Sequence, residues 1–477
     1  MPVFQGQNKI HPGYYSFVNT SGLVNVGILS SGVLAFEGPA LGGVPEQIQV
    51  FTEPTSARSV LRGGDLLTSI QDAFNEGASL IVAVRTGTPG TSVTQSSVSL
   101  PDSLNQNFLT LTSLDYGSYT TGIQVQISAG SISGFLVTVQ FIDTLLGITT
   151  TETFDNNSSI AAAVSAINNA NTGSQLVSAS DSGSAVATAV PVNTNGFVSL
   201  QGGLDDLTPT LTEWTNALAL LDTQTVNIVI LAGVTDPSVY ALLQSHVDTL
   251  SAERKKRIGI VGAALGLPVG VYSNPSSLLG QAYNLNDPRM IYCGVGVDGV
   301  SAAFTAAHLG GWLSGRDVAT SPTFQNLDVT SLEVLFSPTD VNSLLIGGVV
   351  VLEQVPSGRR IARGITTQQD IVPGITEGPY KEITTVRIVD NVDSTLQAAL
   401  EGKYIGQKGI SRNINGIVSD TISLLTQFQE NEIIQGFKNV TAVQDPNNPE
   451  IVNLSFVVAP VFPINWIFST INLVNLV

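Results

Sequence analysis

Basic residues are scarce in this chain, and they are absent from its middle. The 477 residues include 19 Lys and Arg against 37 Asp and Glu, which gives a net charge of −18. No Lys or Arg occurs between Arg85 and Arg254. Nucleic acids and anionic membranes are bound by clustered Lys and Arg, so the composition argues against both as direct partners. We expect the middle of the chain to face solvent or a basic partner.

Charged residues of either sign are also few. They make up 12% of the sequence, against about 25% in a typical soluble domain. The hydrophobic fraction of 43% and the length allow roughly two to four domains with their own cores. The surface must therefore be largely uncharged. Two explanations stay open: a surface that contacts copies of the same chain, or one that is simply rich in Ser, Thr and Asn.

Cysteine and histidine are too few for the common metal and redox sites. Cys293 is the only cysteine, which excludes an internal disulfide and a Cys-rich metal site. It ends an apolar segment, so we expect a small buried side chain and not a nucleophile. The histidines His11, His246 and His308 have no second ligand three or four positions away, which argues against zinc.

Long apolar runs and the common catalytic motifs are absent too. No run of about 18 apolar residues could span a bilayer, and the sequence begins without a signal peptide, so we expect folding and assembly in a cytoplasm. No P-loop, G-x-S-x-G or H-E-x-x-H pattern occurs. We therefore expect no catalytic residue, no metal site and no cofactor.

One motif could still indicate an enzyme. In GVGVDG, Gly294, Gly296 and Gly299 follow a predicted strand and precede a predicted helix, and Asp317 lies about twenty residues on, as in dinucleotide sites. However, the motif lies past the middle of the chain, and Asp298 would place a negative charge where a phosphate sits. We favour a glycine-rich turn, with an NAD(P)-dependent oxidoreductase as the alternative.

Two charged clusters also have ordinary explanations. Asp205 and Asp206, with the other carboxylates of the middle segment, could bind Ca²⁺ or act as an acid/base pair, but they are too dispersed for a recognisable ligand loop. The basic cluster at 254–257 ends a predicted helix, where cations are favoured by the helix dipole. A contact between this cluster and an acidic patch on a neighbouring copy stays open.

The hydrophobic pattern predicts an α/β domain that is interrupted by an insertion. From Val24 the pattern is strand and turn, and helices alternate with apolar strands on both sides of a Ser-, Thr- and Asn-rich stretch of β pattern. Alternating strands and helices are typical of parallel sheets with right-handed crossovers. The predicted strand and helix units lie at 65–84, 226–261, 290–313 and 332–346, and 332–336 is the strand of the last unit.

The C-terminal region has a different pattern. We expect a strand at 382–388, a helix at 392–400 and a longer amphipathic helix at 413–429. Together with the strands that follow, these predict an α+β domain. The fold class is thus multidomain α/β and α+β. The predicted parts are an N-terminal arm at 1–20, an α/β core domain at 21–90 plus 203–380, an inserted β-rich domain at 91–202 on the outer surface, a C-terminal domain at 381–459 and a C-terminal arm strand at 460–477.

Both ends of the chain look like extended arms. Apolar and polar residues alternate from 452 to 458 and again from 466 to 473, which is the period of a strand. An apolar final strand with nothing after it is an exposed edge, and another chain is the simplest cover for it. At the N-terminus, the aromatic stretch 14–18 follows a Pro-Gly break.

Several segments, in order, resemble the tail sheath proteins of contractile phage tails and related contractile injection systems. No single segment is diagnostic, but the ordered set covers most of the chain and is weakest in the insertion. The segments are HPGYYSFVN, AFNEGASLIVAVR, LTSLDYGSYTTGIQVQIS, QGGLDDLTPTLTEWTNALALLDTQTVNIVILAG, RRIARGITT and YIGQKGISRN.

This resemblance implies a structural subunit of a virion tail. Such subunits form stacked hexameric rings around an inner tube and contract to drive the tube through a cell envelope. The implied partners are other copies of the chain, the tail tube protein, and baseplate and tail terminator proteins. Another self-assembling virion protein, such as a tube or capsid subunit, remains an alternative.

The resemblance also implies which residues make contacts. In the family, arms of different subunits pair with the C-terminal domain of a third, and the helix at 413–429 is the candidate for the surface that faces the tube. The expected arm residues are Tyr14, Tyr15, Phe17 and Val18 at the N-terminus and Ile467, Ser469, Ile471 and Leu473 at the C-terminus. The expected tube-facing residues are Arg412, Asn413, Asn415 and Asp420.

Overall fold

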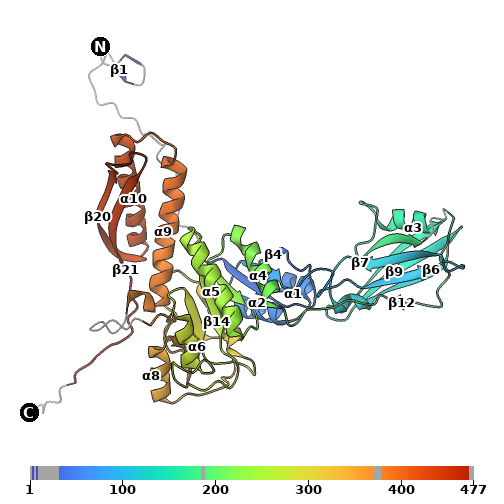
Figure 1. The fold of residues 1–477 in the computed structure, drawn as a ribbon, viewed down its shortest axis with the longest axis horizontal. Coiled ribbons are helices and arrows are strands. Elements are labelled where there is room, and N and C mark those ends of the chain that lie inside the picture. The colour runs from blue at the N-terminus through green and yellow to red at the C-terminus, as the bar shows by residue number, and fades with distance from the viewer. Residues whose placement is uncertain (1–2, 5–6, 9–31, 184–187, 370–377, 472–477) are drawn as a thin grey trace, which may run out of the picture.

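The computed structural model describes residues 3–4, 7–8, 32–183, 188–369 and 378–471. The described chain is a mixed α/β protein with several separate sheets (Figure 1). The inserted β segment lies at one end of the elongated molecule, the large sheet in the middle, and the C-terminal helices with their hairpin at the other end. Within the described ranges, no helix is long and apolar enough to cross a membrane.

A seven-stranded sheet forms the middle of the molecule. Its strands are parallel except for β4, which is antiparallel to β5 at one edge. All residues of the central strands β3, β13 and β14 are buried, as expected for a sheet covered on both faces. In spatial order the strands are β17 (Val349–Val350), β15 (Met290–Cys293), β14 (Ile258–Gly262), β13 (Ile228–Leu231), β3 (Leu34–Gly38), β5 (Ile81–Arg85) and β4 (Ile48–Phe51).

Helices cover both faces of this sheet, and their starts follow from the sequence. Asp236 caps α5, with Pro237 at its first position, and Thr210 and Glu213 form a capping box at α4. The helices are α1 (Pro54–Leu61), α2 (Asp65–Asn75), α4 (Leu211–Leu220), α5 (Pro237–Ala252), α6 (Leu278–Leu285), α7 (Ala302–Ser314) and α8 (Pro338–Ile346), with a short 3₁₀ turn η3 (Leu221–Thr223) after α4.

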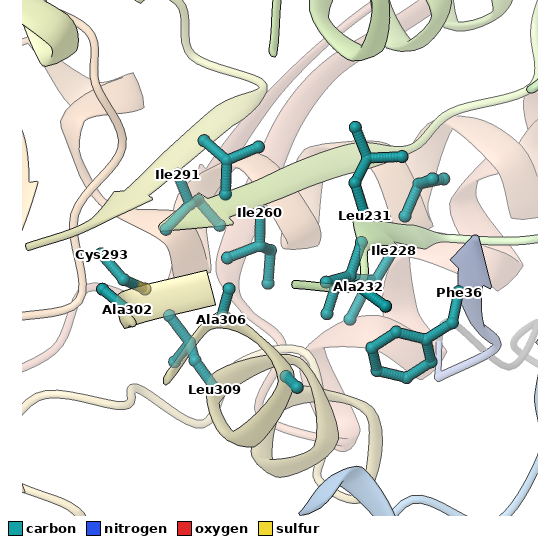
Figure 2. Close-up of a cluster of buried hydrophobic side chains, with 14 of the residues drawn as sticks. Phe36, Ile228, Leu231, Ala232, Ile260, Ile291, Cys293, Ala302, Ala306 and Leu309 are labelled. Carbon is teal, nitrogen blue, oxygen red and sulfur yellow. The ribbon is translucent and has the colours of Figure 1, made fainter. Parts of the chain in front are cut away.

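Helix α7 is the most deeply buried of these elements. Every residue from Ala302 to Leu313 is buried, because one side of the helix faces the sheet and another faces α2. Figure 2 shows Ala306 and Leu309 beneath the strand residue Ile260. A Cβ on Gly311 would come within 2.4 Å of the Ala73 carbonyl oxygen, so glycine is what allows α2 and α7 to approach so closely.

The inserted segment has its own hydrophobic core between two sheets. Its strands alternate buried and partly exposed residues, as the sequence pattern predicts. One sheet has the order β10-β9-β8-β12 and the other β11-β7-β6. The elements are β6 (Ser97–Pro101), β7 (Asn107–Ser113), η2 (Ser118–Gly122), β8 (Ile123–Ala129), β9 (Phe135–Asp143), β10 (Ile148–Asn157), α3 (Ile160–Ile167), β11 (Val177–Gly183) and β12 (Val198–Ser199).

The C-terminal region consists of two long helices and a β-hairpin. They enclose a third hydrophobic cluster, which includes Leu425, Phe428 and Ile434. The elements are η4 (Pro379–Lys381), α9 (Ile383–Tyr404), α10 (Ser411–Glu430), β20 (Ile434–Gln444) and β21 (Val452–Pro460). Smaller strands elsewhere are β1 (Val3–Phe4), β2 (Gln7–Asn8), β16 (Asn326–Leu327), β18 (Leu352–Val355) and β19 (Gly358–Ile361).

Two sequence-based expectations are wrong. The segment 382–388, expected to be a strand, forms the first turns of α9, which continues without a break through 392–400. The segment 332–336 is not a strand either: Leu332 makes a single bridge to Val297, and Leu335 is 67% exposed. The buried pair Val349–Val350 takes the place beside β15. The strand at this edge of the sheet is therefore the buried segment 349–350 and not 332–336.

Candidate assembly interface

The C-terminal hairpin has two open edges. β20 and β21 pair only with each other among the described residues, so the outer edge of each strand presents unpaired backbone groups. One face of the hairpin is packed: Phe437, Val440, Phe456 and Val458 contact the buried cluster of the two helices. The hairpin is therefore a sheet with a covered face and free edges, which is the geometry that accepts additional strands.

The C-terminal segment leaves this hairpin as an exposed apolar chain. Residues 461–471 form no helix or strand in the single chain, so the strand expected at 467–473 is not present in its described part, and Leu473 lies outside it. The side chains of Ile467, Phe468 and Ile471 are 86%, 94% and 81% exposed. Exposure of several large apolar residues within one short segment is typical of a surface that another molecule covers.

The start of this segment is fastened to its own subunit. The Asn465 side-chain amide donates to Glu382 Oε1 at 2.9 Å, and the Arg363 guanidinium lies 4.9 Å from the centre of the Trp466 ring. Arg363 in turn pairs with Glu382, with Nε and Nη2 at 2.8 and 2.5 Å from Oε1. Arg363 belongs to the segment RRIARGITT that carried the family resemblance, but nothing in the sequence linked Arg363 or Glu382 to Asn465 and Trp466 of the arm.

The other expected contact residues are only partly described. Tyr14, Tyr15, Phe17 and Val18 lie outside the described residues. On α10, Arg412 and Asn415 are exposed, and the Asn413 amide donates to the Lys408 carbonyl at 2.8 Å. Asp420 accepts from the Tyr404 hydroxyl and pairs with Lys403, each at 2.7 Å. Asp420 is therefore already engaged within the chain, whereas Arg412 and Asn415 face solvent.

Three ion pairs hold α9 against the middle of the molecule. Arg289 binds Asp390 through two contacts, 2.6 and 2.9 Å long. Lys256 lies 3.1 Å from Asp393, and Arg254 pairs with Glu401. Burial raises the pKa of the Asp390 carboxyl, and Arg289 and Lys256 oppose that shift. The basic cluster at 254–257 thus contacts acidic residues of its own chain.

The glycine motif GVGVDG forms a turn, and its acidic residue Asp298 is hydrogen-bonded within the chain. Asp298 accepts hydrogen bonds from the backbone N–H groups of Thr330 and Ser331, at 2.9 and 2.7 Å. A Cβ on Gly294 would come within 2.5 Å of the Val349 side chain, which explains the first glycine by packing. Gly299 has φ +86°, a conformation that favours glycine. The glycine-turn interpretation accounts for this geometry without a dinucleotide.

The cysteine and the two described histidines are buried or make contacts within the chain. Cys293 is fully buried, and burial raises the pKa of its thiol. His308 Nδ1 lies 2.9 Å from Glu76, and His246 Nε2 lies 3.0 Å from Arg257. His11 lies outside the described residues. In the described part of the chain, no group of three or more His, Cys, Asp or Glu side chains could hold a metal ion.

Asp205 and Asp206 do not act as a pair. Asp205 accepts from the buried Arg85 at the end of β5 at 3.1 Å and from the backbone N–H of Ser118 in the insertion at 3.0 Å, so it joins the two. Burial raises the pKa of Asp206, and the nearby Glu213 carboxylate adds to the shift. Asp205 and Asp206 are both only partly exposed, and the Asp205 contact is internal to the chain.

Comparison with known proteins gives the class to which this fold belongs. The structure of the sheath tail protein from Desulfitobacterium hafniense is similar with a TM-score of 0.68 and 16% identity, over 95% of this chain and all of that one (100%). The contracted helical sheath of the anti-feeding prophage is similar with a TM-score of 0.56 and 10% identity, over 98% and 99% of the two chains. The fold is therefore that of tail sheath proteins.

Sequence comparison leads to the same family. Residues 376–473 match the family model described as the phage tail sheath C-terminal domain. The tail sheath protein of Bacillus phage SP01 is 27% identical over 281 residues, which are 56% of this chain and 46% of that protein. That of Staphylococcus phage Twort is 26% identical over 231 residues, 45% and 37% of the two chains. This chain thus spans half or less of the length of these curated relatives.

Residues 376–473 thus match the phage tail sheath C-terminal domain, and the described chain has the fold of phage tail sheath proteins and contractile injection system sheaths. The curated proteins that it resembles are named tail sheath proteins, in keeping with the sequence-based expectation of a structural protein.

Proposed function

We propose that this chain polymerises as stacked hexameric rings around an inner tube, and that contraction of the polymer drives the tube through a cell envelope. The similarity to a contracted helical sheath supports this proposal, because it is a likeness over nearly the whole chain. The proposed partners are other copies of the chain, the tail tube protein, and baseplate and terminator proteins.

The observation that carries the proposal is the incomplete C-terminal sheet. Two helices packed side by side span about 20 Å. Two strands about 4.8 Å apart cover only about 10 Å of that width. The helices α9 and α10 could therefore accept about two further strands, one on each open edge of the hairpin. Arms from neighbouring subunits would supply both strands.

The two arms of the chain fit this role in different ways. The C-terminal arm, with Ile467, Ser469 and Ile471 on one side of the predicted strand, is exposed on its own subunit. The N-terminal arm carries the aromatic stretch 14–18. Backbone pairing suits such joints, because strand hydrogen bonds can persist while side-chain interfaces repack during contraction.

The predicted domain boundaries and the tube-facing surface belong to the same proposal. The core domain would comprise 21–90 plus 203–380, and the insertion 91–202 would face outward. Arg412 and Asn415, exposed at the start of α10, are the better candidates for tube contact, because Asp420 is engaged by Tyr404 and Lys403.

Deletion of either arm tests the proposal. Removing 1–18 or 460–477 should abolish polymer formation and leave a folded monomer, because each deletion removes one strand of every shared sheet. The measurement is negative-stain microscopy for hollow striated cylinders, with circular dichroism for folding.

A matched control removes an exposed apolar side chain elsewhere. Ile132→Asp changes a residue of the insertion that is 89% exposed, and it should leave polymers intact. Normal cylinders from either deletion variant would refute the exchange of arms, and loss of cylinders with Ile132→Asp would show that a general loss of apolar surface is the cause.

A further inference from the structure

A groove lies between α9 and the large sheet. Its volume is about 810 Å³, within the range of about 300–1,000 Å³ that is typical of sites for small molecules. The floor is apolar, and it is formed where four neighbouring strands, β14, β13, β3 and β5, begin. Strands about 4.8 Å apart make such a floor about 14 Å wide. Its side chains include Ile258, Ile228, Val33 and Leu80.

One face of α9 forms the opposite wall. The lining positions recur every three or four residues, which is the spacing of a single helix face. They run from Arg387 to Glu401, so the wall is about 21 Å long. The wall is polar, in contrast to the floor. Its side chains include Arg387, Asn391, Ser394, Ala398 and Glu401.

Four of the five cationic side chains that line the groove have partners within the chain. Arg254 and Lys256 pair with acidic residues of α9. Lys255 and Arg257 donate to backbone carbonyls. These four cations are therefore already used by the fold.

The fifth cation, Arg387, is only partly satisfied. It is 5% exposed, and its one guanidinium hydrogen bond within the described residues runs from Nη2 to the Leu313 carbonyl at 2.8 Å. Nη1 is buried without a hydrogen-bond partner there. Burial lowers the pKa of the guanidinium to about 10, and the charge of Asp317 opposes that shift. A buried cation that lacks a partner is costly, and an anion beside it would lower that cost.

We propose that this groove binds a small amphipathic carboxylate, with its carboxylate group beside Arg387 and its apolar chain along the floor. A guanidinium suits a carboxylate, because its planar fork of N–H donors matches the two oxygens. Asp390 and Glu401 also line the wall, so a second negative group on the ligand would be repelled. A monocarboxylate is therefore expected. The site belongs to the single chain and does not depend on the proposed polymerisation.

Calorimetric titration of the full-length monomer with octanoate tests the site. Acetate has the same charge without the apolar chain, and 1-octanol has the chain without the charge. We expect octanoate to bind with a dissociation constant at least about tenfold lower than that of either compound, because only octanoate uses both the cation and the floor. An equal affinity for octanoate and either control compound would overturn the proposal, and so would a lack of saturable octanoate binding.

Two variants assign the binding to the groove. Arg387→Met removes the cation and keeps a long side chain, so it should weaken octanoate binding at least about tenfold and leave 1-octanol binding unchanged. Ala398→Trp places a large side chain at an exposed position of the wall and should abolish the binding of both. The matched control Arg58→Met changes an exposed arginine of α1 that does not line the groove, and it should bind octanoate as the parent does.

The unfolding temperature gives a second measurement, because a ligand that binds the folded chain stabilises it. Octanoate should raise this temperature in the parent and in Arg58→Met, but not in Ala398→Trp. An equal rise in Ala398→Trp would mean that octanoate binds elsewhere and would overturn the proposal, even if Arg387→Met fails to fold. Neither measurement uses cylinders, so failure of this site and failure of the sheath proposal are distinguishable.

Discussion

Glu37 is a carboxylic acid in the middle of the large sheet. It is fully buried on β3, and neither of its oxygens has a hydrogen-bond partner among the described residues. Burial raises its pKa well above the usual value, and the charge of Asp222 adds to this, while Arg257 opposes it. The folded chain therefore binds the Glu37 proton more tightly than the unfolded chain does.

This difference predicts how the stability of the monomer depends on pH. When the pKa of an acid is higher in the folded chain than in the unfolded chain, ionisation favours unfolding. The free energy of unfolding then falls as the pH rises from the unfolded pKa to the folded pKa. Each unit of difference is worth about 1.4 kcal/mol. Glu37→Gln removes this penalty, so it should stabilise the monomer at pH 7 and lose most of its advantage near pH 4.5.

The measurement is urea unfolding of both proteins across this pH range. The control is Glu450→Gln, which changes an exposed carboxylate and should have little effect at any pH. A Glu37→Gln variant that is less stable than the parent at pH 7 would mean that the carboxylate is ionised and held by an interaction.

The element that sequence reasoning misjudged most is α9. Thr384, Thr385, Val386 and Ile388 are β-branched residues that favour a strand locally. They form a helix because this turn is buried from two sides. Val386 joins the core of the large sheet and Ile388 the C-terminal cluster, and a helix that is apolar on several faces loses the 3.6-residue pattern.

Elements with one buried face were easier to predict. The amphipathic stripe expected at 413–429 corresponds to α10. Only one of the two features of the candidate assembly interface could be predicted from the sequence. Alternation in the C-terminal arm indicates a strand, but the fastening of Asn465 to Glu382 depends on segments 83 residues apart, which no local pattern reports.

The ion pairs along α9 should differ in their contribution to stability. The Arg289 and Asp390 side chains are 19% and 14% exposed, whereas those of Lys256 and Asp393 are 23% and 56% exposed. Asp390→Asn leaves a largely buried guanidinium without its partner and should lower the free energy of unfolding by about 1–3 kcal/mol. The matched control Asp393→Asn should cost less than about 1 kcal/mol.

Urea unfolding of the monomer at pH 7 distinguishes the two variants. Equal losses would contradict the expected difference between the buried and the exposed pair, and no loss in either variant would indicate that apolar packing alone holds α9 against the large sheet.

At the scale of the whole molecule, charge opposes assembly. Each copy carries a net charge of −18, and a sheath brings many copies together. Salt shortens the range of this repulsion, from about 20 Å at 0.02 M to about 6 Å at 0.3 M. Polymerisation of the purified chain should therefore become faster and more complete as NaCl rises over this range.

Light scattering at fixed protein concentration measures this, with sucrose of equal osmolality as the control for non-ionic effects. A polymer that dissolves as NaCl rises would show that ion pairs between subunits, and not the overall repulsion, dominate the interface.

The length of α9 has a mechanical consequence. Its 22 residues extend about 33 Å, with the buried residues confined to the part before Gln397. A tilt of about 10° at the buried end would displace the free end by about 6 Å. That is more than the spacing of about 4.8 Å between paired strands. The helix can thus act as a lever: in the proposed polymer, strands paired near its far end would move with it, so small rotations of the large sheet would become larger movements between rings.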